Sequence, residues 1–255
     1  MSGTLGTVEF GFVAALPREV RGLVRGWTAT NVRTAGERIS GKPGRIYCGN
    51  QAALVCAGTG VERAYAAAKL LVESCSPRML ISIGFAGACG PELQPGSVVV
   101  PASLVDVATG KLFDCAFGQG RLATLGLVAG KTAKQEAFAR FGAVAVDMEA
   151  AGVARAATEC NRPFAAIKAI SDSAEEDLGF LSAFVTPEGF DTGRFVAHIA
   201  LRPGMWSKVA ALNRNSKLAA AALQGAVGEF IGDWRSFSAR QGHSAAQSGM
   251  KESCQ

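Results

Sequence analysis

Histidine is scarce in this chain. Of 255 residues only two are histidine, His198 and His243, and His243 lies in a polar C-terminal stretch. A Ser-His-Asp or Cys-His mechanism would therefore depend on His198 alone. A zinc site built on histidines is disfavoured for the same reason, so we predict no metal site. The scarcity leaves the carboxylates as the best candidates for chemistry.

Long hydrophobic runs and paired cysteines are also missing. The longest uncharged apolar run, residues 79–91, is broken by Gly84, Gly87 and Gly90 and is too short to span a membrane. The N-terminus has no basic segment and carries Glu9 in its first apolar run, so we expect no signal peptide. The seven cysteines form no C-x-x-C pair, which is typical of reduced thiols in a cytoplasmic protein.

Acidic residues are absent from a long C-terminal segment. Between Thr192 and Gly228 there is no Asp or Glu, although the whole chain carries a net charge of only +5. The basic residues of that segment are Arg194, Arg202, Lys208, Arg214 and Lys217. They favour either a solvated helical face or a peripheral contact with an anionic membrane. Nucleic acid is disfavoured as a partner, because no stacking aromatics are interleaved with the charges.

Hydrophobic periodicity predicts alternating strands and helices. Strands are predicted at 8–16, 45–48, 52–56, 79–83, 97–100, 122–128, 143–146 and 163–170. Helices are predicted at 17–27, 61–75, 132–141, 149–160, 195–201, 205–212 and 216–231. This order predicts one three-layer α/β/α domain over residues 1–235, with a mixed central sheet and a helical C-terminal flank. Residues 236–255 are rich in Ser, Gln, Ala and Gly, so we expect a disordered tail there.

Three acidic residues follow predicted strands. Glu19, Glu149 and Asp172 each come directly after a short apolar run. In an open α/β sheet, such strand ends meet in one crevice, where ligands bind. Carboxyl groups gathered there can divide the roles of acid, base and sugar holder between them. The sequence therefore predicts a site that cleaves a glycosidic bond.

Five short strings carry a family resemblance. They are GFVAALPRE (11–19), AGTG (57–60), SIGFAG (82–87), VDMEA (146–150) and AISD (169–172). In this order, over about residues 8–175, the chain resembles the nucleoside phosphorylase and nucleosidase superfamily, and within it the methylthioadenosine/S-adenosylhomocysteine nucleosidases. Each string is weak alone, but five in order at strand ends are specific. The resemblance implies a small-molecule nucleoside as substrate, and we expect a homo-oligomer.

The resemblance implies a role for each acidic residue. Asp172 matches the aspartate that protonates the departing purine, most simply at N7, and burial would raise its pKa. Glu149 matches the glutamate that holds the ribose hydroxyls, with Met148 packed under the sugar. Glu19 matches the glutamate that orients or deprotonates the attacking water. Each also has a simpler structural reading, Asp172 as a helix N-cap and the two glutamates as first-turn helix residues.

Glycine-rich strings would let the backbone approach the ligand closely. The residues assigned to substrate binding, besides Met148, are Gly58, Gly60, Gly84, Phe85, Ala86, Ser171 and Arg18. The spacing Gly84-x-x-Gly87-x-x-Gly90 is not the dinucleotide fingerprint, and no acidic residue follows where the ribose of a dinucleotide would need one. We therefore predict that the chain uses no cofactor.

Water is favoured over phosphate as the nucleophile. Ser82 and Phe85 stand where related phosphorylases have an arginine and a serine that bind phosphate, although Arg18 matches another phosphate-binding arginine. The aromatic residue that stacks on the base is not assigned. Phe113 and Phe117 are its candidates.

The C-terminal segment carries a second, narrower resemblance. The strings TGRF (192–195), LRP (201–203) and NS (215–216), together with Trp206, resemble the hopanoid-associated phosphorylases. That implies cleavage of adenosylhopane to ribosylhopane, or phosphoribosylhopane, in hopanoid biosynthesis, by a protein at the inner membrane surface. The alternatives are a methylthioadenosine/S-adenosylhomocysteine nucleosidase, a nucleoside-binding protein without catalysis, and a scaffold that docks on membranes. Retention of all three carboxylates argues against the non-catalytic reading.

Overall fold

In the computed structural model the described residues are 6–32, 44–49, 51–186, 189–190, 193–194, 202, 204 and 206–242. A long central strand, β5 (Met79–Ala88), organises the sheet. It pairs in parallel with β1 (Phe10–Ala14) and β11 (Phe164–Asp172), and antiparallel with β10 (Ala143–Asp147). Side chains on both faces of β1 and β11 are buried, which explains their continuous apolar sequences.

Shorter strands extend the sheet to both sides of this centre. The sheet runs β2-β3-β4-β1-β5-β10-β9-β7-β8, with β11 and β6 joined through β5. These strands are β2 (Thr28–Val32), β3 (Gly44–Cys48), β4 (Ala52–Cys56), β6 (Val98–Val99), β7 (Ser103–Asp106), β8 (Leu112–Asp114) and β9 (Arg121–Thr124). A separate pair is formed by β12 (Val185–Thr186) and β13 (Gly189–Phe190). Parallel and antiparallel pairs occur together, so the predicted mixed sheet is confirmed.

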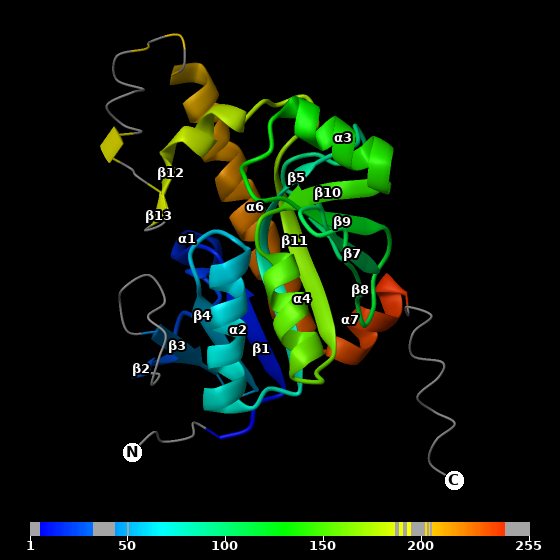
Figure 1. The fold of residues 1–255 in the computed structure, drawn as a ribbon. Coiled ribbons are helices and arrows are strands. Elements are labelled where there is room, and N and C mark those ends of the chain that lie inside the picture. The colour runs from blue at the N-terminus through cyan, green and yellow to red at the C-terminus, as the bar shows by residue number, and fades with distance from the viewer. Residues whose placement is uncertain are drawn as a thin grey trace.

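Helices cover both faces of the sheet (Figure 1). The neighbouring helices α2 (Val61–Cys75) and α4 (Ala150–Glu159) lie on one face, and α6 (Trp206–Gly232) crosses the other. The remaining helices are α1 (Pro17–Val20), α3 (Lys131–Phe141), α7 (Trp234–Gln241) and a 3-10 helix over Gly179–Phe184. Leu223, Val227 and Phe230 of α6 pack on Phe10 and Phe12 of β1. This arrangement confirms the predicted three-layer α/β/α domain.

Three predicted elements differ in extent from the sequence-based expectation, and one cannot be compared. Strand β5 continues through residues 84–87, because β11 pairs with it as far as Gly87. Helix α1 ends at Val20 instead of near residue 27. A single helix, α6, replaces the two predicted over 205–212 and 216–231. The helix predicted at 195–201 lies outside the described residues.

The expected disorder from residue 236 is wrong for the first part of the tail. Residues up to Gln241 form α7, which is capped because the Asp233 side chain accepts a hydrogen bond from the Ser236 N–H at 3.1 Å. Phe237 is buried against Phe230, with ring centroids 5.5 Å apart. The rest of the predicted tail, residues 243–255, is outside the described part of the chain. Among the described residues no helix is long and apolar enough to cross a membrane.

Candidate active site

The three acidic residues predicted from the strand ends are all buried beside β5. Glu19, Glu149 and Asp172 are 3%, 8% and 6% exposed. A Cβ atom added at Gly84 would lie 3.2 Å from Glu19 Oε2, and one added at Gly87 would lie 2.7 Å from Asp172 Oδ2. The charges of Glu19 and Glu149 also influence each other. Glu19 and Asp172 therefore lie against the carboxyl-terminal half of β5, with Glu149 close enough to Glu19 for their charges to interact, and we refer to the region of these three carboxyl groups as the crevice.

Glu19 is held by the turn that starts α1. Pro17 occupies the first position of this helix, where its missing N–H costs nothing. The Leu16 N–H donates to Glu19 Oε2 at 3.0 Å, so the carboxyl folds back over the helix start. Burial raises the pKa of Glu19 above its usual range, although this hydrogen bond and the Lys168 charge oppose the shift. Glu19 does lie in the first turn of α1, as the simpler structural reading had it, but its side chain is buried and not solvated.

Glu149 lies at the start of α4, directly after β10. Its Oε1 accepts a hydrogen bond at 3.0 Å from the backbone N–H of Gly60, whose φ is +106°. Burial, together with the nearby Asp147 charge, raises the pKa of Glu149 to about 8. Met148, beside it, is half-buried. The structure thus joins two predicted strings, 57–60 and 146–150, through one hydrogen bond.

Next to Gly60 lies a polar atom that the sequence reading missed. Thr59 Oγ1 is buried and has no hydrogen-bond partner among the described residues. Buried hydroxyl groups normally have a partner, so this one is free to bind a polar atom of a ligand. The neighbouring Gly58 has a φ of +83°, a backbone conformation that favours glycine.

An ion pair beneath the site was also not foreseen. Lys168 of β11 and Asp147 of β10 both have fully buried side chains, and Lys168 Nζ donates to Ser82 Oγ at 2.9 Å. Asp147 accepts from Thr124 Oγ1 at 2.6 Å and from the Ala150 N–H at 2.9 Å, so it also caps α4. The one available signal was a lysine inside an apolar strand, which needs a buried partner.

Asp172 ends β11 and has a partner on each carboxylate oxygen. Ser171 Oγ donates to Oδ1 at 2.7 Å, and Lys134 of α3 forms an ion pair with Oδ2. Burial raises the pKa of Asp172, and both partners oppose that rise. No helix starts directly after it, since the next described helix begins at Gly179, so the N-cap reading is wrong. Ser171 Oγ also lies 3.4 Å from the Ala86 carbonyl oxygen.

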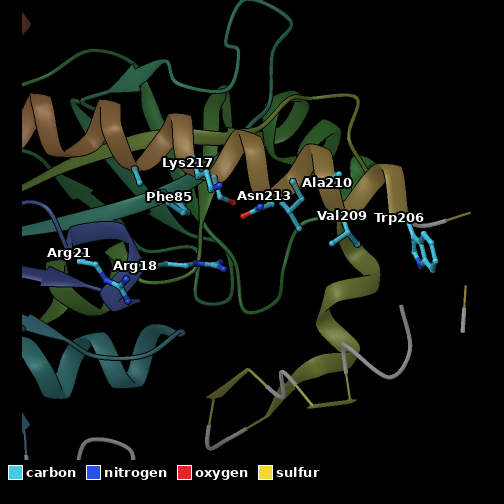
Figure 2. A pocket seen from close by; sticks show the side chains of 11 residues that line it. Arg18, Arg21, Phe85, Trp206, Val209, Ala210, Asn213 and Lys217 are labelled. Atoms are coloured by element: carbon cyan, nitrogen blue, oxygen red, sulfur yellow. The ribbon is translucent and has the colours of Figure 1, made fainter. Parts of the chain in front are cut away.

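A cavity of about 730 Å³ adjoins this crevice. Arg18 and Phe85, which lie next to Glu19 and Gly84 in the chain, line one end together with Arg21. One side of α6 lines the rest, with Lys217 near the arginines and Val209 and Trp206 towards the far end, as Figure 2 shows. The cavity has a cationic end and a more apolar end.

The two candidates for base stacking do not reach this crevice. Phe117 packs in the core against Phe230, with ring centroids 5.8 Å apart, and against Phe237 at 6.3 Å. Phe113 is buried on the outer strand β8, with Lys111 over its ring. Among the described residues, no group of His, Cys, Asp and Glu side chains could hold a metal ion.

Comparison with known proteins identifies one matching family model and several solved structures with a related fold. The model of a family described as the Phosphorylase superfamily matches residues 9–125 and 116–188. The chain is similar to the 5′-methylthioadenosine/S-adenosylhomocysteine nucleosidase of Neisseria meningitidis in complex with methylthio-immucillin-A, with a TM-score of 0.65, 20% identity and coverage of 88% of this chain and 98% of that one. The Streptococcus pneumoniae MTA/SAH nucleosidase in complex with 8-aminoadenine gives a TM-score of 0.57 and 25% identity, with coverage of 76% of this chain and 97% of that one. Futalosine hydrolase of Helicobacter pylori gives a TM-score of 0.62 and 16% identity, with coverage of 88% of this chain and 98% of that one.

Proposed function

Because the chain belongs to the phosphorylase superfamily, we propose that it cleaves the N-glycosidic bond of an adenosine modified at its 5′ carbon and releases adenine. The observation that carries this proposal is the crevice with three buried carboxyl groups, Glu19, Glu149 and Asp172, around the end of β5. Buried carboxyls with raised pKa values suit acid and base chemistry near neutral pH. The solved nucleosidases with related folds support the same reaction class.

Asp172 is the acid of the proposed reaction. As the bond between the sugar C1′ and the purine N9 breaks, its electron pair passes to the purine, which must gain a proton. Asp172 gives that proton to N7, and the purine leaves as neutral adenine. Burial, which raises the pKa of Asp172, favours the protonated form that this step needs.

Glu149 and Glu19 act on the sugar side. Glu149 accepts hydrogen bonds from the ribose hydroxyls, and once it is ionised, as the pH rises through its pKa of about 8, its negative charge stabilises the positive charge that develops on the ring. The Thr59 hydroxyl next to it offers a further hydrogen bond to a sugar oxygen. Glu19 takes a proton from the water that adds to C1′. Its raised pKa makes it a better base than an exposed glutamate.

Water is the proposed nucleophile. Ser82 is fully buried and its Oγ accepts a hydrogen bond from Lys168 Nζ, so it is unavailable to a phosphate ion. Phe85 offers an apolar ring where a phosphate site would need a hydroxyl. Arg18 lines the adjoining cavity, where a phosphate ion could still meet it.

The adjoining cavity supports a bulky apolar 5′ group. It starts beside Phe85 and extends along α6 to Val209 and Trp206. The best candidate for such a substrate is adenosylhopane, converted to ribosylhopane or, with phosphate, phosphoribosylhopane. The alternative is a methylthioadenosine/S-adenosylhomocysteine nucleosidase, which the related solved structures favour. A methylthio group alone would fill little of a cavity of about 730 Å³.

The basic segment supports a peripheral contact with an anionic membrane at its cytoplasmic face. Lys208, Arg214 and Lys217 are exposed on α6, and Trp206 is 57% exposed. A lipid-linked substrate would require the protein to work at the bilayer surface. We also propose that the protein is a homo-oligomer, which the mass of the particle in solution would test.

One assay distinguishes hydrolysis, phosphorolysis and nucleoside binding without catalysis. The purified protein is incubated with adenosines that carry different 5′ groups, with and without inorganic phosphate, and free adenine and the sugar product are measured. We expect adenine in phosphate-free buffer, with a free sugar as the second product. Strict dependence on phosphate, with a sugar 1-phosphate, would show that Arg18 and backbone groups suffice for phosphorolysis. Nucleoside binding without adenine release from any substrate would favour a binding protein and reject the proposed activity.

A further inference from the structure

Lys134 is a fully buried lysine to which the proposed mechanism gives no role. It shares the inward face of α3 with Ala137, and its side chain is 0% exposed. Its Nζ donates to the carbonyl oxygens of Ser173 at 2.8 Å and Glu176 at 2.9 Å, and it forms the ion pair with Asp172 Oδ2. An ammonium group has three N–H donors, so each of them has an acceptor.

The contact between Lys134 and Asp172 depends on a bare backbone at residue 87. A Cβ atom at Gly87 would lie 2.7 Å from Asp172 Oδ2 and 2.9 Å from Lys134 Cε. Three separate elements, α3, β5 and β11, therefore meet at this pair. A lysine that only filled space would not require a glycine on the facing strand.

Two donors reach the carboxyl of Asp172 among the described residues. They are the Ser171 hydroxyl at Oδ1 and the Lys134 ammonium at Oδ2. A charged donor makes the stronger hydrogen bond to a carboxylate, so Lys134 stabilises the ionised form of Asp172 more than Ser171 does.

Other titratable groups lie around the pair. Glu176 is nearby, and its charge raises the pKa of Asp172; its own carboxyl accepts from the Ser173 N–H at 2.8 Å. Burial raises the pKa of Cys89 to about 12, so this thiol stays neutral, and Glu92 acts on the thiol in the same direction. None of these groups donates to Asp172 in the described part of the chain.

We propose that Lys134 is a positioning residue that acts through Asp172, holding its carboxyl in place and stabilising the carboxylate that remains once Asp172 has given its proton to the purine. This inference rests on the proposed function. In the step, the O–H bond of the Asp172 carboxyl breaks and an N–H bond forms at the purine N7, while the Lys134 ammonium keeps its three protons. The Asp172 carboxylate stays paired with Lys134 and regains a proton from solvent after adenine leaves.

Two variants separate the position of Lys134 from its charge. Lys134→Arg keeps a cation beside Asp172, but a planar guanidinium holds its donors in a fixed fork that does not match the three acceptors of the ammonium. We expect its kcat to fall at every pH by at least about tenfold, towards the ~10²–10⁴ range of general acid catalysis, with a much smaller change in KM. Lys134→Met removes the cation that lowers the pKa of Asp172 in the wild type. We expect the alkaline limb of kcat/KM in that variant to move to higher pH.

The control is Lys131→Met, which removes an exposed lysine from the first turn of the same helix. Thermal unfolding establishes that each variant is folded. A Lys134→Arg variant with wild-type kcat and pH profile would overturn the inference. So would an alkaline limb that stays in place, or moves to lower pH, in Lys134→Met. If either result is found while the wild type still releases adenine, only the role of Lys134 is rejected. If the wild type releases no adenine from any substrate, the proposed function itself is rejected.

Discussion

Lys168 Nζ lies 2.8 Å from Asp147 Oδ2, and the side chains of both residues are completely buried. This pair joins β11 to β10, although in the sheet β5 lies between these two strands. The Lys168 charge also lowers the pKa values of Glu19 and Glu149, against the effect of burial. A single lysine thus balances several carboxylates under the candidate site.

Removing this lysine should destabilise the protein. Lys168→Met leaves Asp147 buried without its cation, which costs about 3–5 kcal/mol of unfolding free energy. Chemical denaturation measures the change. The double variant Lys168→Met/Asp147→Asn, in which neither charge remains, should recover part of that loss. A single variant as stable as the wild type would show that the pair contributes little to stability.

Asp172→Asn should nearly abolish adenine release and leave the fold intact. An amide has no acidic proton for the departing purine, and loss of general acid catalysis costs about 10²–10⁴ in rate. Steady-state adenine release on the best substrate measures this, with circular dichroism as the folding check. The matched control is Asp177→Asn, an exposed aspartate five residues further along. Turnover near wild type in Asp172→Asn would remove this residue from the mechanism.

Glu149→Gln should lower kcat much more than it changes KM. Glutamine still offers an oxygen to the ribose hydroxyls, but the negative charge facing the developing cation is lost, at a cost on the order of 10²-fold in kcat. Initial-rate kinetics give both constants. Glu62→Gln, which alters an exposed ion pair with Arg155, serves as the control. A rise in KM alone would make Glu149 a binding residue only.

Glu149 should also make the free energy of unfolding depend on pH. Burial raises the pKa of Glu149 from 4.5 to about 8, so between these values the folded protein binds a proton that the unfolded chain has lost. The stability linked to this proton is present at low pH and is lost as the pH rises through about 8. The unfolding free energy of the wild type should therefore fall relative to Glu149→Gln between about pH 5 and about pH 9. Parallel curves for the two proteins would contradict the shift.

The basic face of α6 should bind anionic liposomes weakly and in a salt-sensitive way. Each basic residue near such a surface contributes about 1 kcal/mol, so Lys208→Glu with Arg214→Glu should reduce binding in flotation assays. It should also slow cleavage of a membrane-embedded substrate but not of a soluble adenosine analogue. The control, Arg45→Glu with Lys111→Glu, makes the same charge change at exposed positions in β3 and immediately before β8. Absence of binding at low salt would leave these residues as a solvated face or a subunit contact.

The sequence predicted most of the fold because its core strands and helices carry strong local patterns. Residues 61–75 form the helix that their periodicity indicated, and the 45–48 and 52–56 strands pair antiparallel. The edge strands β2 and β8, and the short strand β7 beside β8, were missed because their sequences lack a long continuous apolar run. The residues 84–87 were expected to break a strand, but pairing with β11 overrides the local preference of glycine.

By itself the sequence determined which carboxylates follow strands, and it predicted that Glu19, Glu149 and Asp172 would belong to one site. Only the tertiary structure decided which cations face them. In sequence Lys134 is an ordinary polar residue of an amphipathic helix, and its contact with Asp172 spans 38 residues of chain, because 172 − 134 = 38. Periodicity reports which face of an element is buried, but a buried charge finds its partner through packing of elements that are distant in sequence.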